Sequence, residues 1–136
     1  MKLISPLILL AITASPFAHA DFHLLAGNGL AGSAQIAVAS NKYNCGGVEG
    51  SCKGCNANIV SGDLRDAGTS YFSIQGDLCG ATNLDLYRNG DIFLAYNHGG
   101  DGSVQAECYH NHGNGINCGL YWFTEEYVCY SYLCNP

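Results

Sequence analysis

The sequence predicts an all-β fold, a compact disulfide-stabilised β-sandwich or small β-barrel with little or no helix. Short hydrophobic runs with a two-residue period are separated by Gly, Asn, Asp and Ser, which is typical of strands joined by tight turns. No stretch has the longer period of an amphipathic helix. The 136 residues also include eight cysteines, an even number that predicts four disulfides in an exported domain of this size.

The N-terminal residues 1–20 predict a signal peptide. Lys2 supplies a short positive region, residues 3–15 form an apolar run, and Ala18 and Ala20 are the small residues that a signal peptidase recognises. Cleavage is therefore expected before Asp21, and residues 21–136 are expected to form a single secreted cysteine-rich domain. The apolar run is shorter than the roughly 20 residues that span a bilayer, so we expect no membrane insertion.

Eight strands are expected in the secreted part. They are residues 22–25, 35–40, 71–75, 83–88, 91–96, 103–109, 120–123 and 127–132. The clearest turn is Asn89-Gly90, a dipeptide that favours the type I′ turn of a two-residue hairpin loop. That register places Leu86 opposite Phe93. Because both faces of this hairpin are apolar, we expect other elements to cover it on both sides.

All eight cysteines lie in the predicted secreted part, and the sequence leaves their pairing open. They are Cys45, Cys52, Cys55, Cys79, Cys108, Cys118, Cys129 and Cys134. Cys52 and Cys55 have the spacing of thiol oxidoreductase sites, in which the thiolate lies at a helix N-terminus. No helix is predicted here, so we interpret this pair as structural.

The composition disfavours several classes of partner. The chain has five Lys and Arg residues against eleven Asp and Glu residues, and its formal net charge is −6 at pH 7. Such a surface repels phosphate backbones and anionic lipid, so we expect neither nucleic acid nor a membrane as a partner. An extracellular protein or glycan target is expected instead, with no cofactor and a monomeric protein.

Three histidines, His98, His110 and His112, form the main candidate site. Alternating residues of a strand point the same way, so His110 and His112 together suit zinc or copper, with His98 or Glu107 completing the ligand set. A histidine and a glutamate also suit acid/base hydrolysis of a phosphodiester or a glycoside. The simplest interpretation is a polar turn with solvated imidazoles, and all three alternatives remain open.

A second copper hypothesis concerns the N-terminus that cleavage would expose. The free α-amine of Asp21, two backbone nitrogens and the His23 ring form the square-planar nitrogen set that Cu(II) prefers. The same residues also fit the first strand, where their amides would bond within a sheet. The strand is the favoured interpretation.

Aromatic residues concentrate near the C-terminus, and Tyr121, Trp122 and Tyr127 are the candidate binding residues. Strand alternation sends Trp122 to the face opposite Tyr121, so one face can present aromatic surface to a sugar or a protein pocket. The alternative is that these side chains form the core. Glu125-Glu126, between two predicted strands, is interpreted as an exposed turn.

Three segments carry a resemblance to a known class. They are Tyr43-Asn44-Cys45, Glu107-Cys108-Tyr109, and the closing run from Val128 through Cys129-Tyr130-Ser131-Tyr132-Leu133 to Cys134. With the leader and the many Gly, Asn and Tyr residues, they resemble the small secreted cysteine-rich proteins of filamentous fungi, many of which are effector candidates. The resemblance implies an extracellular role and assigns no functional residue.

Two functions follow as hypotheses. The favoured one is a non-enzymatic module that binds a host, microbial or cell-wall target outside the producing cell. The other is a small secreted hydrolase, ribonuclease-like or glycosidase-like, that uses His98, His110 or His112 with Glu107 while Arg65 or Arg88 binds an anion. The small number of basic residues disfavours a nucleic-acid substrate.

Overall fold

The computed structural model describes residues 20–30, 32–50 and 52–134. The predicted signal peptide lies outside these residues, apart from Ala20. The strands and helices are β1 (Ala20–Gly29), β2 (Gly32–Ala39), η1 (Ser40–Lys42), α2 (Cys45–Val48), β3 (Asn56–Val60), β4 (Tyr71–Leu78), β5 (Ala81–Asn89), β6 (Ile92–Asn97), β7 (Val104–His110), β8 (Ile116–Asn117) and β9 (Tyr121–Ser131). In these ranges no helix is long and apolar enough to cross a membrane.

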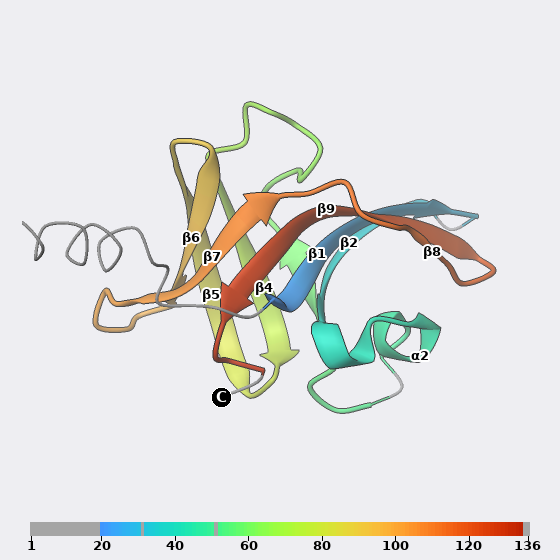
Figure 1. Ribbon diagram of the computed structural model, residues 1–136, viewed down its shortest axis with the longest axis horizontal. Helices are drawn as coiled ribbons and strands as arrows, with labels where there is room; N and C mark the ends of the chain where they lie inside the picture. The colour runs from blue at the N-terminus through green and yellow to red at the C-terminus, as the bar shows by residue number, and fades with distance from the viewer. Residues whose placement is uncertain (1–19, 31, 51, 135–136) are drawn as a thin grey trace, which may run out of the picture.

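The strands form a closed antiparallel barrel (Figure 1). Strands β1 to β7 follow one another in order, β9 pairs with β7, and β1 pairs with both β2 and β9. Because the barrel is closed, each of these eight strands pairs with a neighbouring strand on both sides. The short β8 pairs only with the N-terminal part of β9, outside the ring. The predicted all-β, disulfide-stabilised small barrel is confirmed.

The main core fills the barrel. Its largest fully buried side chains include Phe22, Phe72 and Phe93, with Leu24, Leu84, Leu86, Ile74 and Leu78. Edge-to-face contacts join the Phe93 ring to the rings of Phe72 and Tyr127, with centroids 4.8 and 5.5 Å apart. Such aromatic pairs stabilise a core beyond the area they bury.

A second, smaller core lies outside the barrel wall. Leu25, Ile36, Val38 and Phe123 project outward from β1, β2 and β9 and contact Val48 of α2. These outward-facing side chains make part of the outer barrel wall apolar, and the short helix covers that part (Figure 1).

Four disulfides link the chain as predicted, and the structure supplies their pairing. The pairs are Cys45–Cys118, Cys52–Cys55, Cys79–Cys134 and Cys108–Cys129. The first attaches α2 to the loop that follows β8. The last joins directly opposite residues of β7 and β9 inside the core. Cys52 to Cys55 is a turn and begins no helix.

The β5–β6 hairpin differs in register from the prediction. Its turn residues are Gly90 and Asp91, and Leu86 lies opposite Ala95 where Phe93 was predicted. Gly90 has a φ of +65°, and glycine at the first turn position is what a type II′ loop requires. The shift is an even number of positions, so each side chain keeps its predicted face.

The outer face of this hairpin is not covered. Tyr87 is 51% exposed, and Leu94 and Tyr96 beside it are only partly buried. The prediction that both faces would be covered was wrong, because one closed barrel has a single interior. The outer wall carries tyrosines, whose rings cover apolar carbon and whose polar hydroxyls tolerate contact with water.

β9 is one continuous strand, so the predicted exposed turn at Glu125-Glu126 was also wrong. Both glutamates are buried, with 4% and 5% of their surfaces exposed. Leu24 pairs with Tyr127 and Leu25 with Glu125, so Glu126 is the extra residue of a β-bulge. Both glutamates are therefore strand residues, and the bulge directs their side chains to different sides of the barrel wall. β3 and β8 were not predicted.

Candidate functional site

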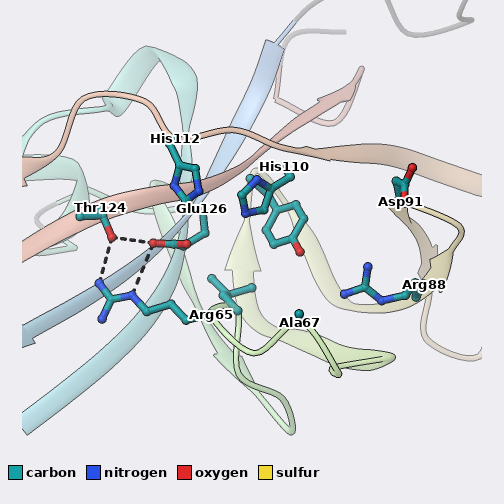
Figure 2. A pocket seen from close by; sticks show the side chains of 10 residues that line it. Arg65, Ala67, Arg88, Asp91, His110, His112, Thr124 and Glu126 are labelled. Atoms are coloured by element: carbon teal, nitrogen blue, oxygen red, sulfur yellow. Dashed lines mark hydrogen bonds and ion pairs between the residues drawn. The ribbon is translucent and has the colours of Figure 1, made fainter.

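Two histidines and a glutamate meet at one mouth of the barrel. His110 ends β7, His112 follows it two residues later, and Glu126 is the bulge residue of β9. One potential ligand atom from each of the three lies within 4.8 Å of the others. Figure 2 shows both imidazoles turned toward the Glu126 carboxylate.

Hydrogen bonds fix the orientation of the Glu126 carboxylate. Thr124 Oγ1 donates to Glu126 Oε2 over 2.6 Å, and Arg65 Nε lies 3.4 Å from the same oxygen (Figure 2). The Arg65 guanidinium also donates to Thr124 Oγ1 and to the Ala26 carbonyl, each at 2.9 Å. Because the contacts of Thr124 and Arg65 with the carboxylate both involve Oε2, Oε1 is the oxygen available to a ligand.

Aromatic contacts support the two imidazoles. The His110 ring meets the His112 ring edge-to-face with centroids 4.4 Å apart, and it meets the Tyr127 ring at 5.3 Å. Tyr127 is only 5% exposed and belongs to the main core, so the structure places it beneath His110. It does not lie on an outer binding surface with Trp122.

The three groups open into a cavity of about 740 Å³. It is lined by Leu64, Arg65, Ala67, Arg88, Asp91, His110, His112, Thr124, Glu126 and Tyr127. Arg65 and Arg88 are the only arginines in the sequence, so an acidic chain brings both of them to one site. The lining also includes the carboxylates of Asp91 and Glu126, and Arg65 pairs with Glu126, so Arg88 is the guanidinium that can contact an anionic ligand.

Arg88 is held rigidly on the cavity wall. Its Nε donates to the Thr69 carbonyl over 2.8 Å, and its guanidinium carbon lies 4.5 Å from the centre of the Phe93 ring. Across the described ranges its two terminal nitrogens make no hydrogen bond, whereas the Arg65 guanidinium bonds to several groups. Arg88 is therefore the cation better placed to bind a ligand anion.

The structure separates His98 and Glu107 from the other histidines. β6 and β7 are antiparallel, so His98, just after β6, lies at the opposite end of the barrel from His110. His98 Nδ1 is 2.7 Å from Asp85 Oδ2. Glu107 lies on the outer wall, where the Tyr109 hydroxyl donates to it over 3.1 Å. His98 and Glu107 therefore cannot complete a ligand set with His110 and His112, and Glu126 takes the third position.

The pair formed by Asp85 and His98 is a local feature of the outer wall. Burial raises the pKa of the Asp85 carboxyl, but hydrogen bonds from His98 and from the Tyr71 hydroxyl outweigh it and bring the pKa below its usual value. His98 is 68% exposed in this pair, so its contact with Asp85 is strongly screened.

The other two predicted aromatic residues lie at the tip of the β8–β9 hairpin. Trp122 is 52% exposed, whereas Tyr121 stacks on Phe123 in the second core, with centroids 5.9 Å apart. This is the predicted alternation. Leu120, in the turn before β9, is 63% exposed, and Leu30, in the neighbouring turn after β1, is 88% exposed. The Leu30 backbone N–H donates to the Leu120 carbonyl over 3.2 Å. We call Leu30, Leu120 and Trp122 the apolar tip.

His23 lies in a strand, so the less favoured copper hypothesis for a cleaved N-terminus lacks the free backbone nitrogens that it needs. His23 pairs within β1 with Val38 of β2 and Val128 of β9, so its backbone belongs to the sheet. Its ring nitrogens contact Glu125 and Ser40. The strand interpretation of this segment is the one that the structure supports.

Glu126 is the residue of the candidate site that the sequence did not predict. Residues 120–132 contain no Gly, Pro, Asn or Asp, and this absence of turn-forming residues is the signal for a continuous strand. Comparison of the chain with family models, curated proteins and solved structures found no match. The function is accordingly inferred from the side chains of the site.

Proposed function

We propose that this protein acts outside the producing cell as a metal-dependent hydrolase of small phosphate esters. The observation that carries the proposal is the meeting of His110, His112 and Glu126 in a cavity that both arginines line. Two imidazoles and one carboxylate are the ligand set of many catalytic zinc sites, which keep a fourth position open for water.

The surroundings of the three side chains suit a metal ion. In a tetrahedral zinc site, bonds of about 2.0 Å place neighbouring ligand atoms about 3.3 Å apart, so a small adjustment of groups now within 4.8 Å is sufficient. Thr124 and Arg65 hold the second oxygen of Glu126, the kind of outer contact that orients a metal-binding carboxylate. The ring nitrogens of His110 and His112 have no hydrogen-bond partner within the ranges described.

The arginines supply the second requirement of the reaction. A metal-bound water is a strong nucleophile near neutral pH. Its oxygen would form a bond to phosphorus, the bond from phosphorus to the ester oxygen would break, and the proton lost by the water would pass to the departing alkoxide. Arg88 faces the same cavity and would bind the equatorial phosphate oxygens. The overall negative charge favours small esters over nucleic acid.

The metal step is tested by titrating the oxidised, secreted protein with Zn(II) in a calorimeter. We expect one zinc ion per chain, and a loss of affinity of at least about tenfold in His110→Ala and in Glu126→Gln. His98→Ala is the matched control, since it removes an exposed imidazole at the other end of the barrel. Equal loss in the control, or zinc binding that survives the His110 change, contradicts the proposal.

The hydrolytic step is tested with bis(p-nitrophenyl) phosphate at saturating zinc. Arg88→Gln should lower kcat/KM by about tenfold or more while zinc affinity stays unchanged, because Arg88 contacts the anion and not the metal. Lys53→Gln, which removes a positive charge outside this cavity, should leave both quantities unchanged. Zinc binding without any zinc-dependent release of p-nitrophenol would reduce the proposal to a metal-binding function.

A second candidate function, binding of an extracellular glycan or protein, is supported by the apolar tip. Leu30, Leu120 and Trp122 expose large apolar surfaces at the ends of two adjoining hairpins. No charged residue occurs in the surrounding sequence, residues 24–34 and 113–123. An exposed indole flanked by leucines is a common contact for sugar rings and for protein pockets.

Sedimentation with insoluble chitin or β-glucan tests the glycan form of this candidate. Trp122→Ser should abolish co-sedimentation, while Tyr87→Ser, which removes an equally exposed aromatic ring from the barrel wall, should not. Unchanged sedimentation of the Trp122 variant, or the same loss in both variants, excludes the tip as the contact.

A further inference from the structure

A second cluster of reactive side chains lies on the outer side of the barrel, away from the metal site. The Ser40 hydroxyl is 2.9 Å from His23 Nε2, and His23 Nδ1 makes a short contact with Glu125 Oε2. The other oxygen of Glu125 accepts a hydrogen bond from Asn111 Nδ2 at 2.9 Å. The order serine, imidazole, carboxylate is thus complete, with a fourth residue orienting the carboxylate.

The three residues come from distant parts of the chain. His23 and Glu125 face each other from the paired strands β1 and β9, and Ser40 follows β2, the other neighbour of β1. The separations in sequence are 17 residues from Ser40 to His23 and 102 from His23 to Glu125. Only closure of the barrel brings β9 beside β1, so the alignment is a product of the tertiary fold.

Burial differs along the cluster in the direction that catalysis requires. Glu125 is 4% exposed, the His23 side chain is 14% exposed, and Ser40 is partly exposed at the end of its strand. The Tyr43 ring stacks on the imidazole, with centroids 4.5 Å apart and planes at 16°. The imidazole is therefore held between a buried carboxyl group and the hydroxyl of a partly exposed residue.

We propose that Ser40 is a nucleophile activated by His23 and positioned by Glu125, and that it accepts acyl groups from small carboxylic esters. The carboxylate accepts a hydrogen bond from Nδ1, which leaves the lone pair of Nε2 directed at the Ser40 hydroxyl. This division of roles defines serine hydrolase triads independently of fold and chain order.

The reaction has two balanced stages. Ser40 Oγ forms a bond to the acyl carbon as its proton moves to His23 Nε2, and the bond from that carbon to the alkoxide oxygen breaks, with the alkoxide taking the proton. Water then attacks the acyl-serine with His23 again accepting the proton, which releases the acid and restores Ser40.

This site is independent of the proposed metal centre. Glu125 and Glu126 are adjacent, but the bulge directs Glu125 toward His23 outside the barrel and Glu126 toward His110 and His112 at its mouth. Reactivity of Ser40 should therefore persist in the presence of a metal chelator and in His110→Ala. The two proposals can fail separately.

Reaction with a fluorophosphonate, followed by peptide mass spectrometry, tests the nucleophile. The Ser40 oxygen forms a bond to phosphorus, fluoride leaves, and His23 takes the proton. We expect labelling of Ser40 in the wild-type protein, none in Ser40→Ala, and a rate lower by about 10²–10⁴-fold in His23→Gln. Hydrolysis of p-nitrophenyl acetate should fall in the same variants.

Ser103 provides an internal control within the same sample. Its exposed hydroxyl donates directly to Asp101 over 2.7 Å, without an imidazole between them. Ser40 should be labelled faster than Ser103 by about the same 10²–10⁴-fold factor. Equal labelling of the two serines, or labelling of Ser40 that is unaffected by His23→Gln, overturns the proposal.

Glu125 is a positioning residue, and its role is read from the tautomer of His23. In Glu125→Gln the amide can donate to Nδ1, which moves the ring proton to Nε2 and removes the acceptor that Ser40 needs. Nitrogen chemical shifts of labelled histidine should report protonated Nδ1 in the wild type and protonated Nε2 in this variant, together with slower labelling. An unchanged tautomer with an unchanged labelling rate contradicts the assignment.

Discussion

At the scale of single residues, two adjacent glutamates organise the polar chemistry of this protein. Buried carboxylates are destabilising unless hydrogen bonds or cations compensate them. Glu125 has His23 and Asn111 as partners, and Glu126 has Thr124 and Arg65. The two candidate sites therefore use the same stretch of β9 but different partners.

The charge of Glu125 should be measurable at Tyr43. Burial, and then the nearby Glu125 carboxylate, raise the pKa of the Tyr43 hydroxyl from 10.0 to about 12. In Glu125→Gln the second cause is removed, so the pKa should fall while staying above 10.0 because burial remains. Carbon-13 NMR of ring-labelled tyrosine across an alkaline titration resolves this residue, and an unchanged Tyr43 pKa in the variant contradicts the contact.

The raised pKa of Tyr43 also makes the stability of the folded protein depend on pH. The folded state holds the Tyr43 proton to higher pH than the unfolded state, since the folded pKa is raised. The stabilisation is therefore complete below pH 10 and is lost as the pH rises from 10 to about 12. Urea unfolding of Tyr43→Phe, which has no hydroxyl to ionise, should lack this part of the alkaline decline.

At the scale of elements, the bulge in β9 decides which face each side chain occupies. Phe123 and Glu125 lie on the outer side of the wall, whereas Tyr127 and Cys129 lie in the barrel core, although all four are odd-numbered. An unbroken strand would place them on one face. The extra residue Glu126 shifts the alternation and is itself directed to the barrel mouth.

The close approach of β1 to β9 offers a test of this pairing. A Cβ atom on Gly29 would lie 2.0 Å from the Leu120 carbonyl oxygen, which is backbone and cannot rotate away. Gly29→Ala should therefore separate the strands near the apolar tip and lower the free energy of unfolding by about 1–3 kcal/mol. Trp122, the only tryptophan, pairs with the adjacent Asn28 and should report the change in its emission.

Gly68→Ala is the control for that experiment. Its Cβ would approach only the Asp66 side chain, at 3.3 Å on an exposed turn. We expect a change in unfolding free energy within about 0.5 kcal/mol and an unchanged tryptophan spectrum. An effect as large as that of Gly29→Ala would show that crowding between β1 and β9 is not the cause.

At the scale of the whole molecule, disulfides of very different span hold the barrel and its outer helix together. Cys45–Cys118 spans 73 residues and Cys52–Cys55 spans 3. Loop-closure entropy predicts about 4 kcal/mol of stabilisation for the first and about 2 kcal/mol for the second. Replacing each pair by serines and measuring urea unfolding should give the larger loss for Cys45–Cys118.

A larger loss of stability for Cys52–Cys55 than for Cys45–Cys118 would mean that contacts in the folded state outweigh the entropy of the unfolded chain. The Cys45–Cys118 variant should also loosen the second core, because α2 then keeps only non-covalent contacts with the wall, such as the packing of Val48 and the hydrogen bond from Asn56 Nδ2 to the Val48 carbonyl. Amide exchange in residues 45–48 should accelerate, while exchange in β5 and β6 should remain as in the wild-type protein.

The fold class, the disulfide content and most strands of this protein could be predicted from local patterns in its sequence. Two-residue periodicity, turn residues and cysteine number are local properties, and alternation alone placed Trp122 and Tyr121 on opposite faces. It also singled out His110 and His112. These predictions need no knowledge of which strands become neighbours.

Which residues become neighbours across the barrel depends on the folded structure and could not be predicted in this way. The cysteine pairing, the approach of Glu126 and both arginines to the histidines, and the alignment of Ser40, His23 and Glu125 all depend on closure between β1 and β9. A one-residue bulge directs Tyr127 into the core, and Glu125 and Glu126, which were predicted to form an exposed turn, are buried. Local pattern carries no information about such long-range neighbours, because contacts between residues about a hundred positions apart form only when the barrel closes.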